Sequence, residues 1–239
     1  MTTVEIVAQA LLDARRDGVR ADGSVLPSPD YHQALAIQRV VHRQIGPVSG
    51  FKVAPRPDGQ PVIAPISAAR TVRTGVPVRV GDRLGIELEI GFEVIAPPGP
   101  DPMAESTQVF RPRIVLELVD NRLTGAEHNA LLKLADMQIN DGLVVGPALA
   151  GWDGRDFGTV EARLICGGRV VVDGPATLPG GSALANLALL CAHLGDHCGG
   201  LRQGQIVITG SLSGLEYFPA GTDVSGHIAD LGSVSCRLE

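Results

Sequence analysis

The chain has 239 residues, of which 44% are hydrophobic and 19% charged, so it can form a well-buried domain and is neither disordered nor fibrous. Its aromatic content of 3% and formal net charge of −6 exclude the stacking platforms and basic surfaces typical of nucleic-acid-binding proteins. The sequence has no apolar run long enough for a membrane span, no secretion signal at its start and no C-x-x-C pair, so we expect a cytoplasmic protein.

The first quarter of the chain is predicted to be helical. Apolar residues at helical spacing predict a helix over 4–16, and Ser28, which precedes a proline, predicts the N-cap of a second helix that ends near residue 46. We therefore expect a single domain in which a helical segment, 1–46, precedes a β-rich core, 47–239.

After residue 47 the sequence favours strands. The four prolines between residues 55 and 65 predict a loop there, and two further helices are expected at 125–137 and 182–194. Strands are predicted, in chain order, at 48–54, 84–95, 113–119, 160–173 (a hairpin turned at a Gly-Gly pair), 205–210, 223–229 and 233–238.

Three glutamates lie on two of these strands. Glu87 and Glu89 point to the same face of the strand 84–95, roughly 6.5 Å apart along the chain, and could bind one cation. A solvated acidic face is the commoner explanation of this pattern. Glu117 lies in a strand that is otherwise apolar, where a carboxylate is costly unless it lies at an exposed edge, pairs with an arginine or binds a metal. If the three lie together, they form an all-oxygen site suited to Mg²⁺ or Mn²⁺.

Lys52, Gly210 and Ser211 are further candidates. The chain has only two lysines, and Lys52 lies in a short apolar strand, where it either snorkels or forms a partly buried ammonium that transfers protons. Gly210 and Ser211 follow an apolar strand and form either an ordinary turn or a place of close backbone approach to a ligand.

A zinc site is disfavoured. His193 and His197 are four residues apart between Cys191 and Cys198, but Leu194 stands where the catalytic zinc motif H-E-x-x-H has its glutamate. Free cysteines and histidines of this kind are common in apolar cores.

Five segments, in this order and spacing, resemble those of the 2-keto-4-pentenoate hydratase / 4-oxalocrotonate decarboxylase family of the fumarylacetoacetate hydrolase superfamily. They are 50–52 (GFK), 86–92 (IELEIGF), 116–122 (LELVDNR), 135–146 (ADMQINDGLVVG) and 206–212 (IVITGSL). The resemblance extends over nearly the whole chain. It implies an α+β fold with a fumarylacetoacetate-hydrolase-like mixed β-roll core, flanking helices and a helical N-terminal segment.

The resemblance also implies roles for individual residues. Mg²⁺ or Mn²⁺ would be bound by Glu87, Glu89 and Glu117, Lys52 would be catalytic, and the substrate would contact Asp136, Gly210 and Ser211. The loop after Lys52 is shorter than in the family, so Asp58 is a candidate replacement for the family's loop aspartate. The serines that bind substrate in the family are absent from the segment after Asp136, which predicts an altered substrate pocket.

The implied activity is hydration. We expect a divalent-metal-dependent hydratase that adds water to a 2-hydroxy-2,4-dienoate to give a 4-hydroxy-2-oxo acid, in the catabolism of aromatic compounds. The alternatives are a decarboxylase of 4-oxalocrotonate-like 2-oxo acids, a hydrolase of acylpyruvate carbon–carbon bonds, and a non-catalytic partner subunit. The resemblance implies a homo-oligomer, with or without an associated paralogous decarboxylase or hydratase. Composition and charge predict no nucleic-acid partner, and the absence of a long apolar run predicts no membrane partner.

Overall fold

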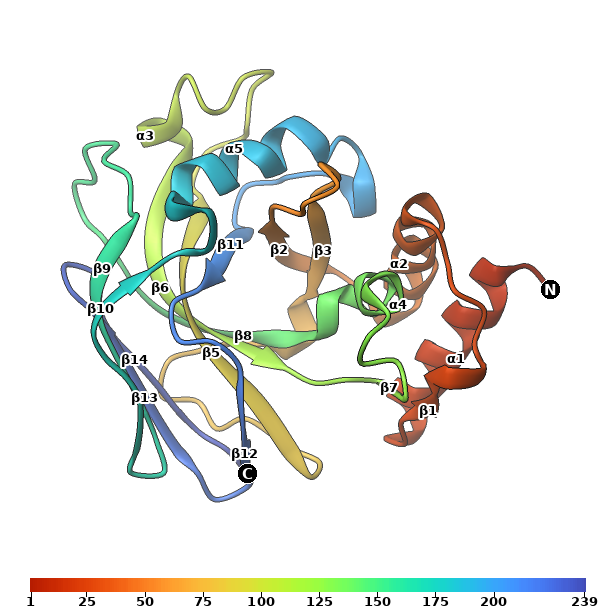
Figure 1. Cartoon of the computed structure of the whole chain (residues 1–239). Coiled ribbons are helices and arrows are strands. Elements are labelled where there is room, and N and C mark those ends of the chain that lie inside the picture. The colour runs from red at the N-terminus through yellow and green to blue at the C-terminus, as the bar shows by residue number, and fades with distance from the viewer.

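The structure is a computed structural model that describes residues 1–239 (Figure 1). Its helices are α1 (Thr3–Asp17), α2 (Tyr31–Ile45), α3 (Ser106–Val109), α4 (Ala130–Ala135) and α5 (Ala183–His193). Its strands are β1 (Ala21–Asp22), β2 (Val48–Ala54), β3 (Val62–Ser67), β4 (Thr71–Arg73), β5 (Arg83–Val94), β6 (Phe110–Val119), β7 (Leu123–Thr124), β8 (Asn140–Ala148), β9 (Thr159–Cys166), β10 (Arg169–Thr177), β11 (Ile206–Ser211), β12 (Glu216–Pro219), β13 (Asp223–Ile228) and β14 (Gly232–Arg237). Five one-turn segments are η1 (Gly23–Val25), η2 (Ala68–Arg70), η3 (Met137–Ile139), η4 (Pro179–Gly181) and η5 (His197–Gly199).

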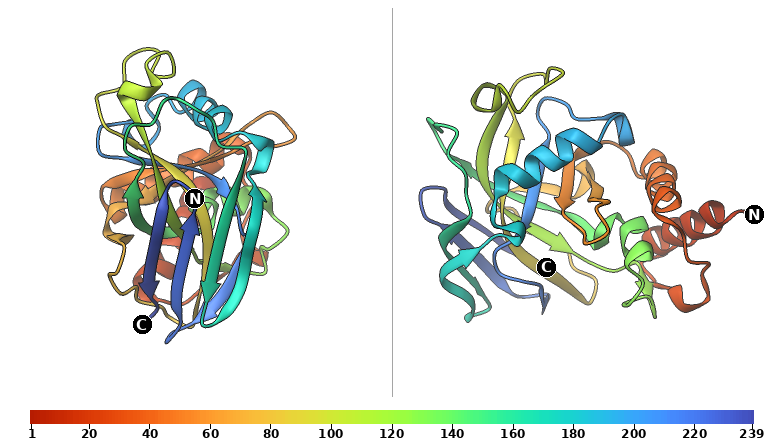
Figure 2. Two further views of the ribbon diagram at one scale, coloured as in Figure 1. Left: turned by 90° about the vertical axis from the view of Figure 1, so that its left-hand side faces the viewer. Right: turned by 45° about the horizontal axis from the view of Figure 1, so that its top comes forward.

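A curled sheet of eight strands forms the centre of the molecule. Its order is β3-β2-β11-β5-β6-β8-β4, and β12 also pairs with β5. The long strands β5 and β6 are antiparallel, whereas β2 and β11 are parallel, so the sheet is mixed. A second sheet, in the order β10-β9-β13-β14, lies against one face of the first, as Figure 2 shows, and α5 packs over β2 and β11.

The main hydrophobic core lies between the two sheets. Ile86, Leu88, Ile90 and Phe92 on β5 are fully buried there. A Cβ atom on Gly226 of β13 would lie 2.8 Å from Leu88 Cδ1, so the small sheet approaches β5 too closely for a side chain at this glycine. Because strand side chains alternate between faces, the intervening residues of β5 face the opposite side of the main sheet.

That opposite face is also apolar. A smaller cluster of buried side chains covers it, formed by Ile66, Val115, Leu143, Ile206 and Ile208. Carboxylates on this face are therefore shielded from water even though they point away from the main core.

The N-terminal helices pack onto the sheet through a core of their own. Side chains of α1 and α2 form an apolar cluster with residues of α4 and β3, beside the edge of the main sheet (Figure 1). The predicted N-cap of the second helix is wrong by two residues, since Asp30 caps α2. Asp30 Oδ1 accepts a hydrogen bond from the Gln33 backbone N–H at 2.7 Å, and the Asp30 backbone N–H donates one to Gln33 Oε1 at 3.0 Å, which is a capping box that Ser28 could not form.

Most of the predicted strands and helices are present, with three notable differences. The predicted proline loop contains β3, in which Pro65 is opposite Phe51, and this position is tolerated because β3 is an edge strand. The helix predicted at 125–137 is shorter in the structure, where α4 covers only Ala130–Ala135. Asn129 caps its start, and the chain leaves the helical conformation after Ala135. The strand β8 was not expected. None of the helices has the length and apolar character needed to span a bilayer.

Candidate metal centre

Three glutamates from β5 and β6 meet on the shielded face of the main sheet. In the antiparallel register Glu87 is directly opposite Glu117, and Glu89 follows on the same face. Their carboxylate oxygens lie within 4.8 Å of one another, and no other group of three or more His, Cys, Asp or Glu side chains in the chain is close enough to bind one metal ion. Glu117 is fully buried and Glu89 is 1% exposed. The structure therefore brings together the three residues that the resemblance implies as metal ligands.

Lys52 reaches this cluster from β2. The strand β11 lies between β2 and β5, and its residue Ile208 pairs with Lys52 on one side and with Gly91 on the other. The Lys52 Nζ donates to both Glu117 oxygens, at 2.9 and 2.8 Å, and lies 3.8 Å from Glu87 Oε2. Its side chain is 13% exposed. Lys52 is thus a largely buried ammonium held by the carboxylates.

The electrostatics of the cluster are unbalanced. Burial raises the pKa of Glu87, partly opposed by Lys52 and reinforced by Glu117, and burial together with Glu117 raises the pKa of Glu89 well above its usual value. Burial disfavours the Lys52 ammonium, but the charges of Glu117, Glu87 and Glu89 raise its pKa above the ordinary value. With all three carboxylates ionised, as ligands of a metal ion must be, and one ammonium, the formal charge is −2, which a divalent cation would neutralise.

One oxygen of Glu89 has no partner in the protein. Glu89 Oε2 accepts a hydrogen bond from the Gly210 amide at 2.7 Å, whereas Oε1 is buried without any hydrogen bond. Such an atom is costly unless something binds it, and a cation among the three glutamates would do so. The donor set, which consists only of carboxylate oxygens, fits Mg²⁺ or Mn²⁺.

Gly210 and Ser211 border the cluster at the end of β11. Gly210 has a φ of 123°, and a Cβ there would lie 3.0 Å from Pro179 Cδ, so only glycine fits this position without strain. Ser211 pairs with Glu89 across β11 and β5 after a register shift. The backbone at this strand end thus approaches the carboxylates closely.

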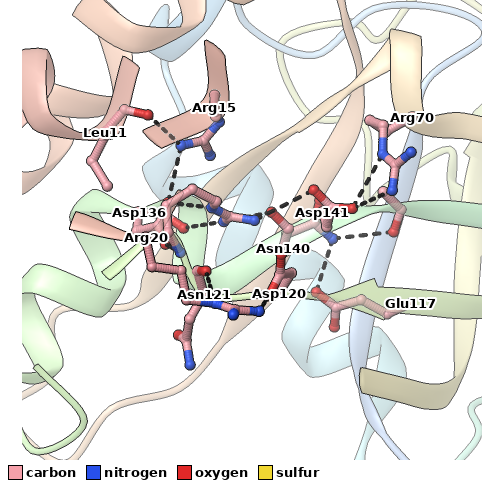
Figure 3. A network of polar contacts seen from close by, with 12 residues as sticks. Leu11, Arg15, Arg20, Arg70, Glu117, Asp120, Asn121, Asp136, Asn140 and Asp141 are labelled. Carbon is pink, nitrogen blue, oxygen red and sulfur yellow. Dashed lines mark hydrogen bonds and ion pairs between the residues drawn. The ribbon is translucent and has the colours of Figure 1, made fainter. Parts of the chain in front are cut away.

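The two aspartates singled out from the sequence do not join the cluster. Asp136 is buried beside α1 and accepts hydrogen bonds from Arg122 Nε at 2.7 Å and Arg15 Nη1 at 3.1 Å (Figure 3). Asp58 forms an ion pair with Arg56 at 2.7 Å within the loop between β2 and β3. Both carboxylates are therefore bound to arginines rather than directed at the glutamates.

Sequence reasoning missed one residue that contacts the cluster. The Asn140 side chain, at the start of β8, donates its Nδ2 hydrogen to Glu117 Oε1 at 2.9 Å and is buried (Figure 3). A polar residue ahead of the apolar run 142–146 was the only signal for it, because β8 itself was not predicted.

His197 and Cys198, considered above as zinc ligands, belong to a hydrogen-bonded contact with α2. His197 is buried, and its Nε2 lies 2.8 Å from Gln38 Oε1 on α2 and 3.5 Å from Cys198 Sγ. Gln38 in turn donates to the carbonyl oxygens of Ile63 and Leu134. These contacts connect η5, α2, β3 and α4.

Comparison with known proteins gives similarity of structure only, since no family model and no curated protein matches the sequence. A structure of 4-oxalocrotonate decarboxylase from Pseudomonas putida G7, complexed with calcium and acetate, is similar over 100% of this chain and 99% of that one, with a TM-score of 0.81 and 19% identity. The same enzyme complexed with magnesium and adipate gives a TM-score of 0.78 at 20% identity, over 100% of this chain and 99% of that one. Fumarylpyruvate hydrolase from Pseudomonas aeruginosa, in complex with Mn²⁺ and pyruvate, covers 76% of this chain and 80% of its own, with a TM-score of 0.55 and 15% identity. The expected α+β fold, with a mixed, curled β core, flanking helices and a helical N-terminal segment, is confirmed, and these structures share it.

Proposed function

We propose that this protein is a divalent-metal-dependent enzyme acting on a 2-oxo or 2-hydroxy-dienoic acid, with Mg²⁺ or Mn²⁺ bound by Glu87, Glu89 and Glu117. The observation that carries the proposal is the buried three-carboxylate cluster, in which Glu89 Oε1 lacks a partner and Lys52 balances only part of the charge. Calcium, magnesium and Mn²⁺ in the complexes of the similar structures support it.

The residues of the site have different roles in such a reaction. A bound divalent cation would polarise the 2-oxygen of the substrate and stabilise negative charge that develops there. Lys52 carries a proton on Nζ beside Glu117 and transfers it to or from a carbon of the substrate held at the cluster. The Gly210 amide holds Glu89 Oε2, and the apolar cluster on this face limits access of water to the carboxylates.

Hydration is the reaction we assign first. When a 2-hydroxy-2,4-dienoate ketonises, Lys52 supplies a proton to carbon, and water then adds to the remaining double bond to give a 4-hydroxy-2-oxo acid. This assignment follows the segments of the sequence that resemble the hydratase/decarboxylase family, with Lys52 in the GFK segment and the three glutamates in the two strand segments.

Decarboxylation is the second candidate, and one observation favours it. The decarboxylase structure matches the whole chain, including the N-terminal helices, whereas the hydrolase structure matches 76% of it. Loss of CO₂ from a 2-oxo diacid would pass through the same negatively charged 2-oxygen, so the cluster serves both reactions. A decarboxylase would need an additional cationic or amide group for the second carboxylate.

An absorbance assay tests the proposal. The purified chain is mixed with 2-hydroxypenta-2,4-dienoate, and loss of the dienol absorbance is followed with Mn²⁺ or Mg²⁺ and again after EDTA. Fast loss that EDTA abolishes is the result expected for a hydratase. Binding of Mn²⁺ without loss of absorbance would rule out this substrate, and CO₂ release from a 4-oxalocrotonate-like acid would then identify the decarboxylase. Absence of both metal binding and turnover would overturn the proposal in favour of a non-catalytic partner subunit.

A further inference from the structure

A left-handed turn precedes β8 directly. Met137, Gln138 and Ile139 have φ values of 54°, 50° and 57°, and none of them is glycine. The left-handed conformation brings Cβ too close to the following carbonyl oxygen, and the β-branched Ile139 suffers most. Three such residues in succession persist only where surrounding contacts determine the backbone, and strain of this kind is concentrated at functional sites.

Arg122 holds both ends of this turn. Its Nη2 donates to the carbonyl oxygens of Asp136, at 3.0 Å, and Asn140, at 2.8 Å, which flank the three left-handed residues. Its Nε and backbone N–H donate to the two carboxylate oxygens of Asp136, at 2.7 and 3.0 Å. Arg122 is 5% exposed, so these charge-assisted hydrogen bonds are made away from water.

The turn places the Asn140 side chain against Glu117. Glu117 Oε1 accepts a hydrogen bond from Asn140 at 2.9 Å, which Figure 3 shows. Oε1 also accepts from Lys52 at 2.9 Å, whereas Oε2 accepts only from Lys52, at 2.8 Å. The two oxygens of this carboxylate are thus unequal, and Oε2 retains more of its capacity to bind a cation.

We infer that Asn140 is a positioning residue for the metal centre: it fixes Glu117 through Oε1 and leaves Oε2 for the cation, and the Arg122-held turn serves to present it. Hydrogen bonds from neighbouring side chains orient metal-binding carboxylates in this way. The inference rests on the proposed metal site but not on the identity of the reaction. Asp136, which the sequence suggested as a substrate contact, acts here through Arg122 and the turn.

The test measures Mn²⁺ affinity by calorimetry on the purified full chain, with no substrate present. We expect Asn140→Ala to weaken Mn²⁺ binding by roughly 10- to 100-fold, the usual effect of losing such a hydrogen bond. Gln38→Ala is the matched control. The Asn140 amide donates to Glu117 and, at 3.4 Å, to the Gly142 carbonyl oxygen; the Gln38 amide is also buried and also donates two hydrogen bonds, yet none of its contacts involves the glutamates. It should lower the melting temperature and leave Mn²⁺ affinity unchanged.

A second variant covers the case in which Asn140→Ala does not fold. Gln138→Gly relieves the left-handed conformation without moving the turn, so it should raise the melting temperature and retain wild-type Mn²⁺ affinity. Gln138→Pro cannot adopt the φ of 50°, and should weaken Mn²⁺ binding even though residue 138 is not a metal ligand.

Two outcomes would contradict the inference or the metal site itself. If Asn140→Ala binds Mn²⁺ as tightly as the wild type, the inference is wrong while the metal site stands. Where Asn140→Ala does not fold, the same conclusion follows from wild-type Mn²⁺ affinity in Gln138→Pro. If the wild type itself binds no Mn²⁺, the proposed function fails with the inference.

Discussion

Glu87 and Glu117 lie directly opposite each other on β5 and β6, with their carboxylates on the same face of the sheet. Like charges in this arrangement destabilise a sheet, and burial of both side chains increases the cost. Only one ammonium, that of Lys52, lies close enough to offset them. The sheet therefore maintains an arrangement that is unfavourable for folding alone and favourable for binding a divalent cation.

Replacement of Glu87 separates these two effects. In metal-free protein, we expect Glu87→Gln to stabilise the fold by up to about 1 kcal/mol, the size of a cross-strand charge interaction, because it removes one of the opposed charges. The same variant should lose the stabilisation that Mn²⁺ gives to the wild type, which for ligand at 100 times its dissociation constant is about 2.7 kcal/mol. Urea unfolding with and without Mn²⁺ measures both, and a variant that is less stable than wild type without metal would contradict the argument.

Removal of the lysine has the opposite effect on the metal-free protein. Lys52→Met leaves the fully buried Glu117 without its charged partner, and breaking a buried pair in this way typically costs about 3–5 kcal/mol. Bound Mn²⁺ should restore much of that stability, since it supplies the missing positive charge. Turnover should remain absent even with metal, because no other amino group reaches the cluster. Stability, metal affinity and activity are measured on the same preparation, with Lys52→Arg as the variant that keeps the charge.

The resemblance implied the carboxylate cluster and the strand pattern was compatible with it, whereas the residues alone left a solvated acidic face as the commoner explanation for Glu87 and Glu89. Alternation along β5 places Glu87 and Glu89 on one face, and Glu117 was conspicuous as a charge in an apolar strand. Lys52 was identified from the rarity of lysine and its apolar surroundings, although its pairing with Glu117 depends on β11 lying between β2 and β5.

The elements that were missed depend on contacts between distant segments. The strand β3 contains a proline and is stable as an edge strand beside β2, a position that the sequence does not reveal. The turn Met137–Ile139 has no glycine or asparagine to signal a left-handed backbone, and the Arg122 hydrogen bonds to the carbonyl oxygens at both of its ends join segments that are distant in the sequence. Asn140 could not be connected with Glu117 until that turn was known.

The buried His197 predicts a loss of stability in acid. Burial lowers the pKa of His197 to about 4 from an ordinary value of 6.5, and the nearby Arg39 and His42 act in the same direction against Asp196. As the pH falls, the His197 ring of the unfolded chain is therefore protonated before that of the folded chain. The contribution of the neutral ring to the free energy of unfolding is complete above pH 6.5 and is lost between about pH 6.5 and 4. A shift of this size corresponds to about 3 kcal/mol.

The cause is visible in the contacts of the ring. Nε2 donates to Gln38 Oε1, while Nδ1 is buried with no partner, so a proton added there would have no acceptor. Urea unfolding of wild type and His197→Gln from pH 7.5 to 4 isolates this contribution from that of the carboxylates. The difference between the two proteins should narrow as the pH falls, and a constant difference would exclude His197 as the source.

Arg122 should be far more important for stability than arginines with similar but exposed contacts. Arg122→Lys retains the charge but cannot donate simultaneously to Asp136 and to the carbonyl oxygen of Asn140, so we expect a loss of about 3 kcal/mol, typical of a broken buried network. Arg20→Lys is the matched comparison: Arg20 also pairs with two aspartates, but its side chain is 29% exposed, and an exposed pair contributes at most about 1 kcal/mol. Equal losses in urea unfolding would mean that the Arg122 contacts contribute no more than surface pairs, and that the left-handed turn is held by packing around Met137 instead.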